Sequence, residues 1–376
     1  MTAQKNFINF HVLISHSPSC LNRDDQNMQK RAVFGGVERI RISSQCLKRA
    51  MRFSSYYLKE FGAPSIRSNK LEKLVVKFTE ALKEKYPAEL IKKSVEWISG
   101  KSEFKTDDEA DSVAPWAIAE VAMFCDRIKE AEKTNVDQDK LKKQIEKEAS
   151  SFRKNFEKAI DIALSGRMAT FGLMNALPVD GSLAVAHAIT THAAQADTDW
   201  FTAVDDLVQD SGEVGAGHLD TQEFSSGVFY RYASLNIAQL QENLGGAARQ
   251  RALEIAKHVF HMLCMVVPSA KQQAFGAHNL ADFAIVTFDD LPISLANAFE
   301  RPIEKEKNGG YMKPSVDSLA GYFKKMKVMY GLGNTIAGFP ANIDADKEGI
   351  AGLNLLESLS GVEKWIAGDG AKSDKE

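Results

Sequence analysis

The alternation of apolar and polar side chains predicts a strand over Phe7–Ile14 and another over Val37–Ile42. Ser43 and Ser44 follow the second strand and are good helix N-caps, and the spacing of the next apolar residues predicts a helix over Gln45–Arg52. A polar loop joins the two strands. The chain therefore begins with two strands and a helix that directly follows the second of them.

The middle of the chain has a different pattern. From about residue 69 to residue 158 it is rich in Glu, Lys, Ala and Leu, which is typical of several amphipathic helices. Charges are sparse from Ile162 to Thr191. The elements predicted beyond residue 161 are a helix and three strands, namely Ala247–Val267, Ser182–Thr190, Phe224–Tyr232 and Phe283–Phe288. We expect the last of these to be the final clear strand, before a poorly patterned segment and a polar tail.

This order of elements predicts an α+β fold. A sheet domain of β-α-β-β-α-β type, with the helical block inserted after its first helix, accounts for this order most simply.

The 376 residues can bury a large core, and a content of 44% apolar and 26% charged residues is that of an ordinary soluble protein. Four widely spaced cysteines, no secretory segment and no long apolar run predict a cytoplasmic protein that does not enter a membrane.

Charge is unevenly distributed along the chain. The segment Arg23–Arg52 holds eight basic and three acidic residues, although the whole protein has a net charge of −3. A helix N-terminus attracts anions, and Lys48 and Arg52 lie one turn apart on the predicted helix. This pattern indicates a surface for a polyanion. A solvated amphipathic helix with surplus charge is the alternative interpretation.

Other candidate groups have simpler explanations. The carboxylate pairs Asp24-Asp25 and Asp205-Asp206 could bind Mg²⁺ or act as bases, but such pairs are common at loops and helix starts. The histidines at 187, 192, 258 and 261 lack the Glu or Cys neighbours of a usual zinc site. Nucleotide-binding glycine patterns and serine-nucleophile motifs are absent. We therefore expect no metal and no cofactor.

Two neighbouring aromatic residues in a polar segment offer a further hint. Trp200 and Phe201 fall in a polar segment, predicted to be a loop, where they would either stack on bases or anchor the loop to the core. Met168 is flanked by small residues that let another backbone approach closely. Lys140, Lys142 and Lys143 form a second basic cluster, for which a solvated helix face is the simple explanation.

Several long motifs resemble the CasC family, the RAMP-type backbone subunits of the type I-E CRISPR surveillance complex, Cascade. They occupy residues 15–25, 41–52, 163–170, 187–192, 199–206 and 221–230. The likeness extends from about Phe7 to Phe299 and fades after about Arg301. It implies a hand-like protein with a modified ferredoxin-like (RNA-recognition-motif) palm over 1–60 and 166–300, helical fingers over 61–165, and a thumb loop over about 193–224. Residues 301–376 receive no role.

The resemblance also implies which residues meet nucleic acid. The palm positions that line the sugar-phosphate track of the guide RNA correspond here to Arg23, Lys30, Ser43, Gln45, Lys48, Arg49 and Arg52. The residues that interrupt base stacking correspond to Met168 in the palm and to Trp200, Phe201 and Thr202 in the thumb. Lys140 and Lys143 match finger positions that hold target DNA, whereas the third lysine of that family cluster is Asp139 here.

The expected function is that of a non-catalytic scaffold in antiviral defence. It would bind CRISPR RNA, target DNA, other Cascade subunits and further copies of itself, six in the family complex, while leaving base edges free for pairing. The first rival is a metal-dependent RNA endonuclease using Asp24 or Asp25, as in related type III backbone subunits. The second is a metabolic α+β enzyme with an incidental basic surface.

Overall fold

The computed structural model describes residues 4–101, 109–147, 153–168, 171–204, 216–333, 335–340 and 353–371. The chain divides into two compact units. The first comprises residues 1–51, 185–234 and 257–376, and the second comprises residues 52–184 and 235–256.

A mixed sheet forms the first unit. Its strand order is β12-β11-β10-β1-β9-β7-β3-β2. The pair β11–β12 is parallel, and the pairs β11–β10, β10–β1, β9–β7, β7–β3 and β3–β2 are antiparallel. The strands are β1 (Phe7–Ser19), β2 (Arg31–Phe34), β3 (Val37–Ile42), β7 (Ala188–Thr190), β9 (Ala216–Asn236), β10 (Phe283–Asp289), β11 (Thr335–Pro340) and β12 (Asn354–Leu355). The mixed sheet with packed helices confirms the predicted α+β class.

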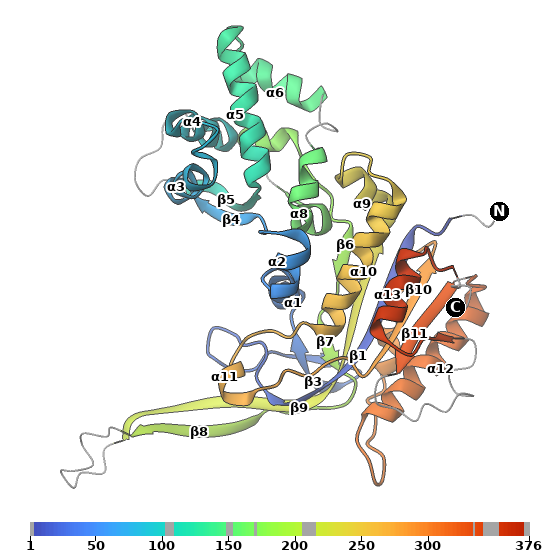
Figure 1. Ribbon diagram of the computed structural model, residues 1–376. Coiled ribbons are helices and arrows are strands. Elements are labelled where there is room, and N and C mark those ends of the chain that lie inside the picture. The colour runs from blue at the N-terminus through green and yellow to red at the C-terminus, as the bar shows by residue number, and fades with distance from the viewer. Residues whose placement is uncertain are drawn as a thin grey trace. The chain divides into compact units, whose positions relative to one another are not determined.

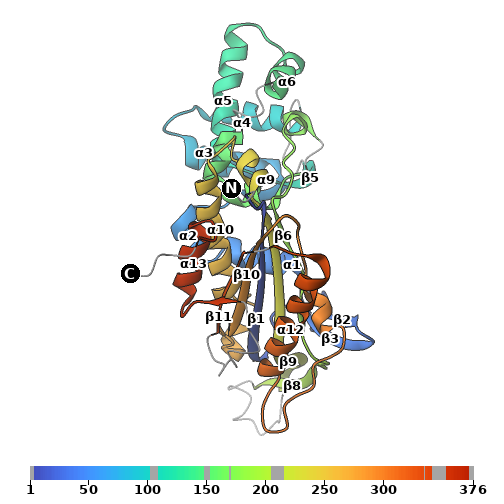
Figure 2. The ribbon, with the colours of Figure 1, turned by 90° about the vertical axis from the view of Figure 1, so that its right-hand side faces the viewer.

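Helices cover both faces of this sheet, so its central strands are buried on each side (Figure 2). On one face Phe10 stacks on Phe260 of α10 (Arg249–Met265), with ring centroids 6.0 Å apart, and Phe288 meets Trp365 of α13 (Leu359–Ala367) at 5.3 Å. On the other face α12 (Met312–Tyr330) packs against Leu13. Burying each such side chain stabilises the fold by about 1.5–3 kcal/mol.

The C-terminal part of the chain belongs to this sheet. β10 is not the final strand, because β11 pairs with it along its length and β12 follows. The expectation that Phe283–Phe288 is the final clear strand is therefore wrong. The segment lacks a clear period because α12 and α13 each carry only a narrow apolar stripe, and β12 is two residues long. The short elements α11 (Gln272–Phe275) and η4 (Ala296–Phe299) complete the unit.

A tight hairpin joins β2 to β3. Gly35 and Gly36 adopt φ angles of 62° and 76°, which suit a two-residue turn between right-twisted strands. A Cβ atom on Gly35 would lie 1.6 Å from the carbonyl oxygen of Glu300, so only glycine fits there. The turn is thereby held against the segment that follows η4.

The segment predicted to be a thumb loop is a β-hairpin. β8 (Asp197–Val204) pairs antiparallel with the first half of β9, with Trp200 opposite Thr221, and the hairpin extends away from the other strands of the sheet (Figure 1). The interpretation of residues 197–204 as a loop is wrong, because β-forming residues alternate with the polar ones and find a partner strand. The hairpin tip lies outside the described residues, as does the Asp205-Asp206 pair.

The second unit is mainly helical, with a small β4–β5 sheet that the sequence pattern did not reveal. Its elements, with strand β6 at its boundary, are α2 (Ser55–Phe61), β4 (Ile66–Lys70), α3 (Leu71–Leu82), α4 (Ala88–Ser99), β5 (Glu109–Trp116), α5 (Ile118–Lys133), α6 (Gln138–Lys147), η1 (Lys154–Lys158), α8 (Ile160–Ser165), η2 (Gly172–Ala176), β6 (Leu183–Val185) and α9 (Ile237–Asn243). Phe78, Trp116 and Phe124 are fully buried in its core.

Two buried histidines make the first unit sensitive to acid. Burial lowers the pKa of His11 and of His16 to about 3, so both stay neutral in the folded protein. The unfolded chain binds a proton at each histidine below pH 6.5, so stability present above that pH is lost as the pH falls towards 3. As the pH falls from 7 to 5, each of the two histidines should lower the free energy of unfolding by about 2 kcal/mol.

Urea unfolding at several pH values tests this prediction. His11→Asn is a suitable variant, because His11 Nδ1 lies within hydrogen-bonding distance of the Tyr230 hydroxyl, at 2.8 Å, and an Asn amide can hydrogen-bond to that hydroxyl in its place. The variant should lose about half of the pH dependence attributed to the two histidines. Equal pH dependence in the variant and the unaltered protein would show that His11 contributes nothing.

Candidate nucleic-acid interface

Helix α1 (Ser44–Arg52) begins directly after β3 and is capped by Ser43. The Ser43 Oγ accepts a hydrogen bond from the Cys46 amide at 3.2 Å, and the Ser43 amide donates to Asn22 Oδ1 at 2.8 Å. Ser43 is 6% exposed, so its side chain serves the helix. No acidic residue lies in the first turn, which leaves the positive end of the helix dipole favourable for an anion.

The two faces of α1 differ in character. Leu47 packs on Ile42 in an apolar cluster of the first unit, and this contact fixes the helix on the sheet. Gln45 and Arg49 are exposed, and Lys48 is half-buried. The helix therefore presents a polar, positively charged side away from its packed face.

Arg39 of β3 does not belong to the charged surface. It is 0% exposed and donates to the carbonyl oxygens of Thr190 at 3.0 Å, Phe299 at 2.8 Å and Phe34 at 3.2 Å. Burial lowers its pKa from the ordinary arginine value. The expectation that Arg39 adds to a polyanion surface is wrong, because its five N–H donors cross-link three backbone segments instead.

Two further arginines have carboxylate partners within the protein. Arg31 pairs with Glu223 of β9, which is 3% exposed, and lies 3.5 Å from Glu38. Arg52 is 8% exposed, and its Nε lies 3.6 Å from Asp161 Oδ2 inside the second unit. The positive charges of Arg31 and Arg52 are therefore largely balanced by these carboxylates.

The remaining basic residues near α1 form what we call the basic patch: Lys30, Arg41, Lys48 and Arg49. Arg41 Nη1 lies 3.1 Å from His187 Nδ1. Burial lowers the pKa of His187, and the neighbouring Arg41 and Lys30 lower it further. Arg41 belongs to the basic segment that the sequence indicated, but its contact with His187 was not predicted, because 146 positions separate two side chains that the pairing of β3 with β7 brings together.

The loop that contains Asp24 and Asp25 is closed by its own side chains. Asp24 Oδ1 accepts from the amides of Gln26 and Met28, both at 2.9 Å, and Arg23 donates to Asn27 Oδ1. These bonds give the Asp24 carboxylate a loop-stabilising role. Asp25 is exposed. Across the described part of the chain, no group of three or more His, Cys, Asp or Glu side chains could hold a metal ion.

The residues expected to interrupt base stacking are exposed where the structure describes them. Trp200 of β8 is 67% exposed, and Met168, between Arg167 and the undescribed residues 169–170, is 88% exposed. Large apolar side chains so exposed suit a surface that contacts a partner. The backbones of Phe201 and Thr202 lie in β8, but their side chains fall outside the described part.

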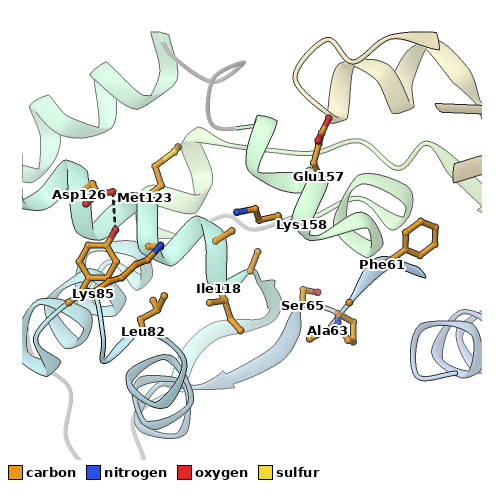
Figure 3. Close-up of a pocket in the computed structure, with 16 residues that line it drawn as sticks. Phe61, Ala63, Ser65, Leu82, Lys85, Ile118, Met123, Asp126, Glu157 and Lys158 are labelled. Atoms are coloured by element: carbon orange, nitrogen blue, oxygen red, sulfur yellow. Dashed lines mark hydrogen bonds between the residues drawn. The ribbon is translucent and has the colours of Figure 1, made fainter. Parts of the chain in front are cut away.

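The second unit carries the other features of interest. Lys140 and Lys143 are exposed on α6, and Lys140 Nζ lies 3.5 Å from Asp137. A cavity of about 690 Å³ lies between α3, the start of α5 and η1 (Figure 3). Lys85, Lys158, Asp126 and Glu157 line it, so its ionisable groups balance, and the Tyr86 hydroxyl donates to Asp126 at 2.9 Å. We assign it no ligand.

Comparison with known proteins identifies the family. Residues 8–364 match the Cas family described as CT1975-like protein. The chain belongs to this family. The match extends far beyond residue 301, so the expectation that the likeness fades there is wrong. No significant match to a curated protein was found. No helix in the described ranges is both long and apolar enough to cross a membrane.

Solved structures agree with the family match. A chain of a "CRISPR RNA-guided surveillance complex, pre-nicking" is 26% identical, with a TM-score of 0.78, over 97% of this CT1975-like protein and 100% of that chain. A chain of another "CRISPR RNA-guided surveillance complex" is 22% identical, with a TM-score of 0.58, over 96% and 99%. These matches confirm the resemblance to a Cascade-type protein that the sequence motifs indicated.

Proposed function

We propose that this CT1975-like protein is a non-catalytic backbone subunit of a type I-E Cascade complex in the cytoplasm. It binds CRISPR RNA, assembles with further copies of itself and other subunits along the guide, and presents the guide to target DNA. The full-length likeness to a chain of an RNA-guided complex carries the proposal. The basic patch beside a capped helix supplies the chemistry.

The proposed hand keeps the bounds that the resemblance implies. We assign the palm to residues 1–60 and 166–300, the fingers to residues 61–165 and the thumb to the β8–β9 hairpin. Arg23, Gln45 and the basic patch would hold sugar and phosphate groups, and Ser43 would act by capping α1. Arg52 would act through its pair with Asp161, which fixes the end of α1. Met168 and the thumb residues 200–202 would separate stacked bases, and Lys140 and Lys143 would hold target DNA.

Phosphate contacts suit this task because they carry no sequence information. A guide-binding backbone must accept every spacer sequence and leave the base edges free for pairing. Cationic side chains and a capped helix start attract phosphate without reading a base. Separating an occasional pair of bases costs a few kcal/mol and leaves the others in short ordered runs.

Salt dependence of RNA binding tests the proposal. If each subunit neutralises about four to six phosphates, the logarithm of the association constant should fall with the logarithm of salt concentration at a slope of roughly −3 to −4 per subunit. Titrations of RNAs of unrelated sequence at several salt concentrations measure this slope. A flat response, or affinity for one sequence only, would contradict phosphate-track binding.

The endonuclease alternative makes an opposite prediction. It requires Mg²⁺-dependent cleavage of a bound target RNA that is lost in Asp25→Asn or Asp24→Asn. Asp24→Asn keeps an oxygen for the amides of Gln26 and Met28, so the loop should remain closed. Cleavage that disappears in either variant would replace the scaffold proposal with an enzymatic one.

A further inference from the structure

The β8–β9 hairpin leaves the sheet through an irregular junction. The ladder between β7 and β9 ends at the pair Thr190–Phe229, and the ladder between β8 and β9 starts at Asp197–Phe224. Between these pairs the first strand uses two residues more than β9. The Thr191 amide still donates to the Val228 carbonyl at 2.9 Å, so residues 192–196 bulge out of the ladder, and the direction of the hairpin depends on what holds this bulge.

His192 fills the junction with its side chain. It is 3% exposed, its Nδ1 donates to the Ala193 carbonyl oxygen at 2.9 Å, and its Nε2 accepts from the Val228 amide at 3.3 Å. A carbonyl can only accept and an amide N–H can only donate, so the ring is neutral with its proton on Nδ1. The ring thus takes the place of a missing strand carbonyl for the Val228 amide, while the Val228 carbonyl accepts from the Thr191 amide at 2.9 Å.

Gly227 is shaped to receive this ring. Its φ angle is +156°, and a Cβ atom there would lie 2.5 Å from His192 Nε2. A side chain at this position would expel the imidazole from the junction. The fit between the histidine and the glycine is therefore specific.

The C-terminal part of the chain supports the junction from the other side. The ring of Tyr311 stacks on His192, with centroids 3.7 Å apart and an interplanar angle of 12°. The Ile303 amide donates to the Thr191 carbonyl at 3.0 Å, and the Ser315 and Thr191 hydroxyls lie 2.8 Å apart. Residues 303–315, to which the sequence assigned no role, thus pack on the root of the hairpin.

We propose that His192 is a positioning residue, which with Tyr311 sets the direction in which the thumb hairpin leaves the palm sheet. The inference rests on the proposed function, because it concerns where Trp200 meets the guide. Trp200 pairs with Thr221, six residues from Gly227. At about 3.3 Å per residue, Trp200 lies roughly 20 Å from the junction along the hairpin. A change of about 10° in the direction of the hairpin at the junction therefore moves Trp200 by about 3.5 Å. That distance is about one base step.

Footprinting of the guide RNA tests the inference. Complexes assembled with the unaltered protein, His192→Ala or His192→Gln are treated with a reagent that modifies unstacked bases. In His192→Ala the modification at the interrupted positions should fall roughly fivefold, as expected for the loss of one buried hydrogen bond. RNA affinity should stay within about twofold, because no phosphate contact is removed. His192→Gln, whose amide oxygen can accept from Val228, should restore part of the pattern.

A double-mutant cycle separates positioning from general damage. Gly227→Ala should reproduce the His192→Ala pattern, and adding it to His192→Ala should change the footprint little further. Tyr311→Leu, which removes the stacking but no hydrogen bond of His192, provides a second test if His192→Ala folds poorly. An unchanged pattern in folded variants that still bind RNA overturns the inference and leaves the proposed function intact. An unaltered protein that gives no regular pattern and no RNA binding overturns both.

Discussion

Replacing Lys30, Lys48 and Arg49 together by alanine should weaken guide RNA binding by roughly 50-fold per subunit at physiological salt. All three belong to the basic patch, and each lost phosphate contact removes the release of about 0.7 counterion from single-stranded RNA. The salt slope should therefore become less steep by about 2. Titrations against RNAs of several sequences measure both quantities, and the loss should be similar for every sequence.

The matched control removes the same charge elsewhere. Lys305, Lys324 and Lys325 are exposed in the C-terminal part of the first unit, and their triple alanine variant should change affinity far less. If the control weakens binding as much as the patch variant, the interaction reflects net charge alone. If the loss depends strongly on RNA sequence, the contacts are to bases and the phosphate-track account is wrong.

Arg167→Ala should lower the unfolding free energy of the protein by about 3–5 kcal/mol. Arg167 and Glu120 form a two-pronged ion pair, with N–O distances of 2.6 and 2.7 Å and with 0% and 2% of their side chains exposed. Arg167 also donates to the Leu177 carbonyl at 3.2 Å. Removing the guanidinium leaves the buried Glu120 carboxylate without its partner. This lowers the free energy of unfolding by far more than the intact pair contributes to it.

Urea unfolding measures this loss, and an exposed ion pair provides the control. Lys77 and Glu80 lie 3.2 Å apart with 63% of each side chain exposed, so Lys77→Ala should change stability by less than about 1 kcal/mol. Arg167→Lys, which keeps the charge but loses the fork, should fall between the two. Equal effects of Arg167→Ala and Lys77→Ala would contradict the account of this pair. Met168, which is proposed to separate stacked bases, directly follows Arg167. The pair of Arg167 with Glu120 therefore also holds the segment that carries Met168.

Local patterns predicted the elements that carry the basic patch. Alternation gave β3 with its observed ends, and Ser43 marked the start of α1. Whether an individual charged side chain is exposed or buried was not predictable in this way. Lys48 and Arg52 share one helical face by spacing, yet Arg52 is buried because Asp161, 109 residues away, supplies its counter-charge. Likewise Arg39 has the same sequence context as Arg41, but its partners are carbonyls of distant segments.

The β8–β9 hairpin illustrates a second limit of sequence reasoning. Acidic residues at 197 and 199 suggested a loop. These residues form β8 instead, because the first half of β9 provides a strand with which they pair. His192 was considered only as a possible metal ligand, since nothing local links it to Gly227 or Tyr311. Such contacts depend on long-range packing, which a single sequence does not display.

The most direct test of the central claim is a footprint of the guide RNA in the assembled complex, with a reagent that modifies unstacked bases. The account predicts reactive bases at regular intervals along the guide, which disappear when Trp200 and Phe201 are replaced together by alanine. It also predicts that RNA stays bound in that variant, because the phosphate contacts remain. Uniform reactivity along the guide, with no high-mass assembly of protein on RNA, would contradict the scaffold function.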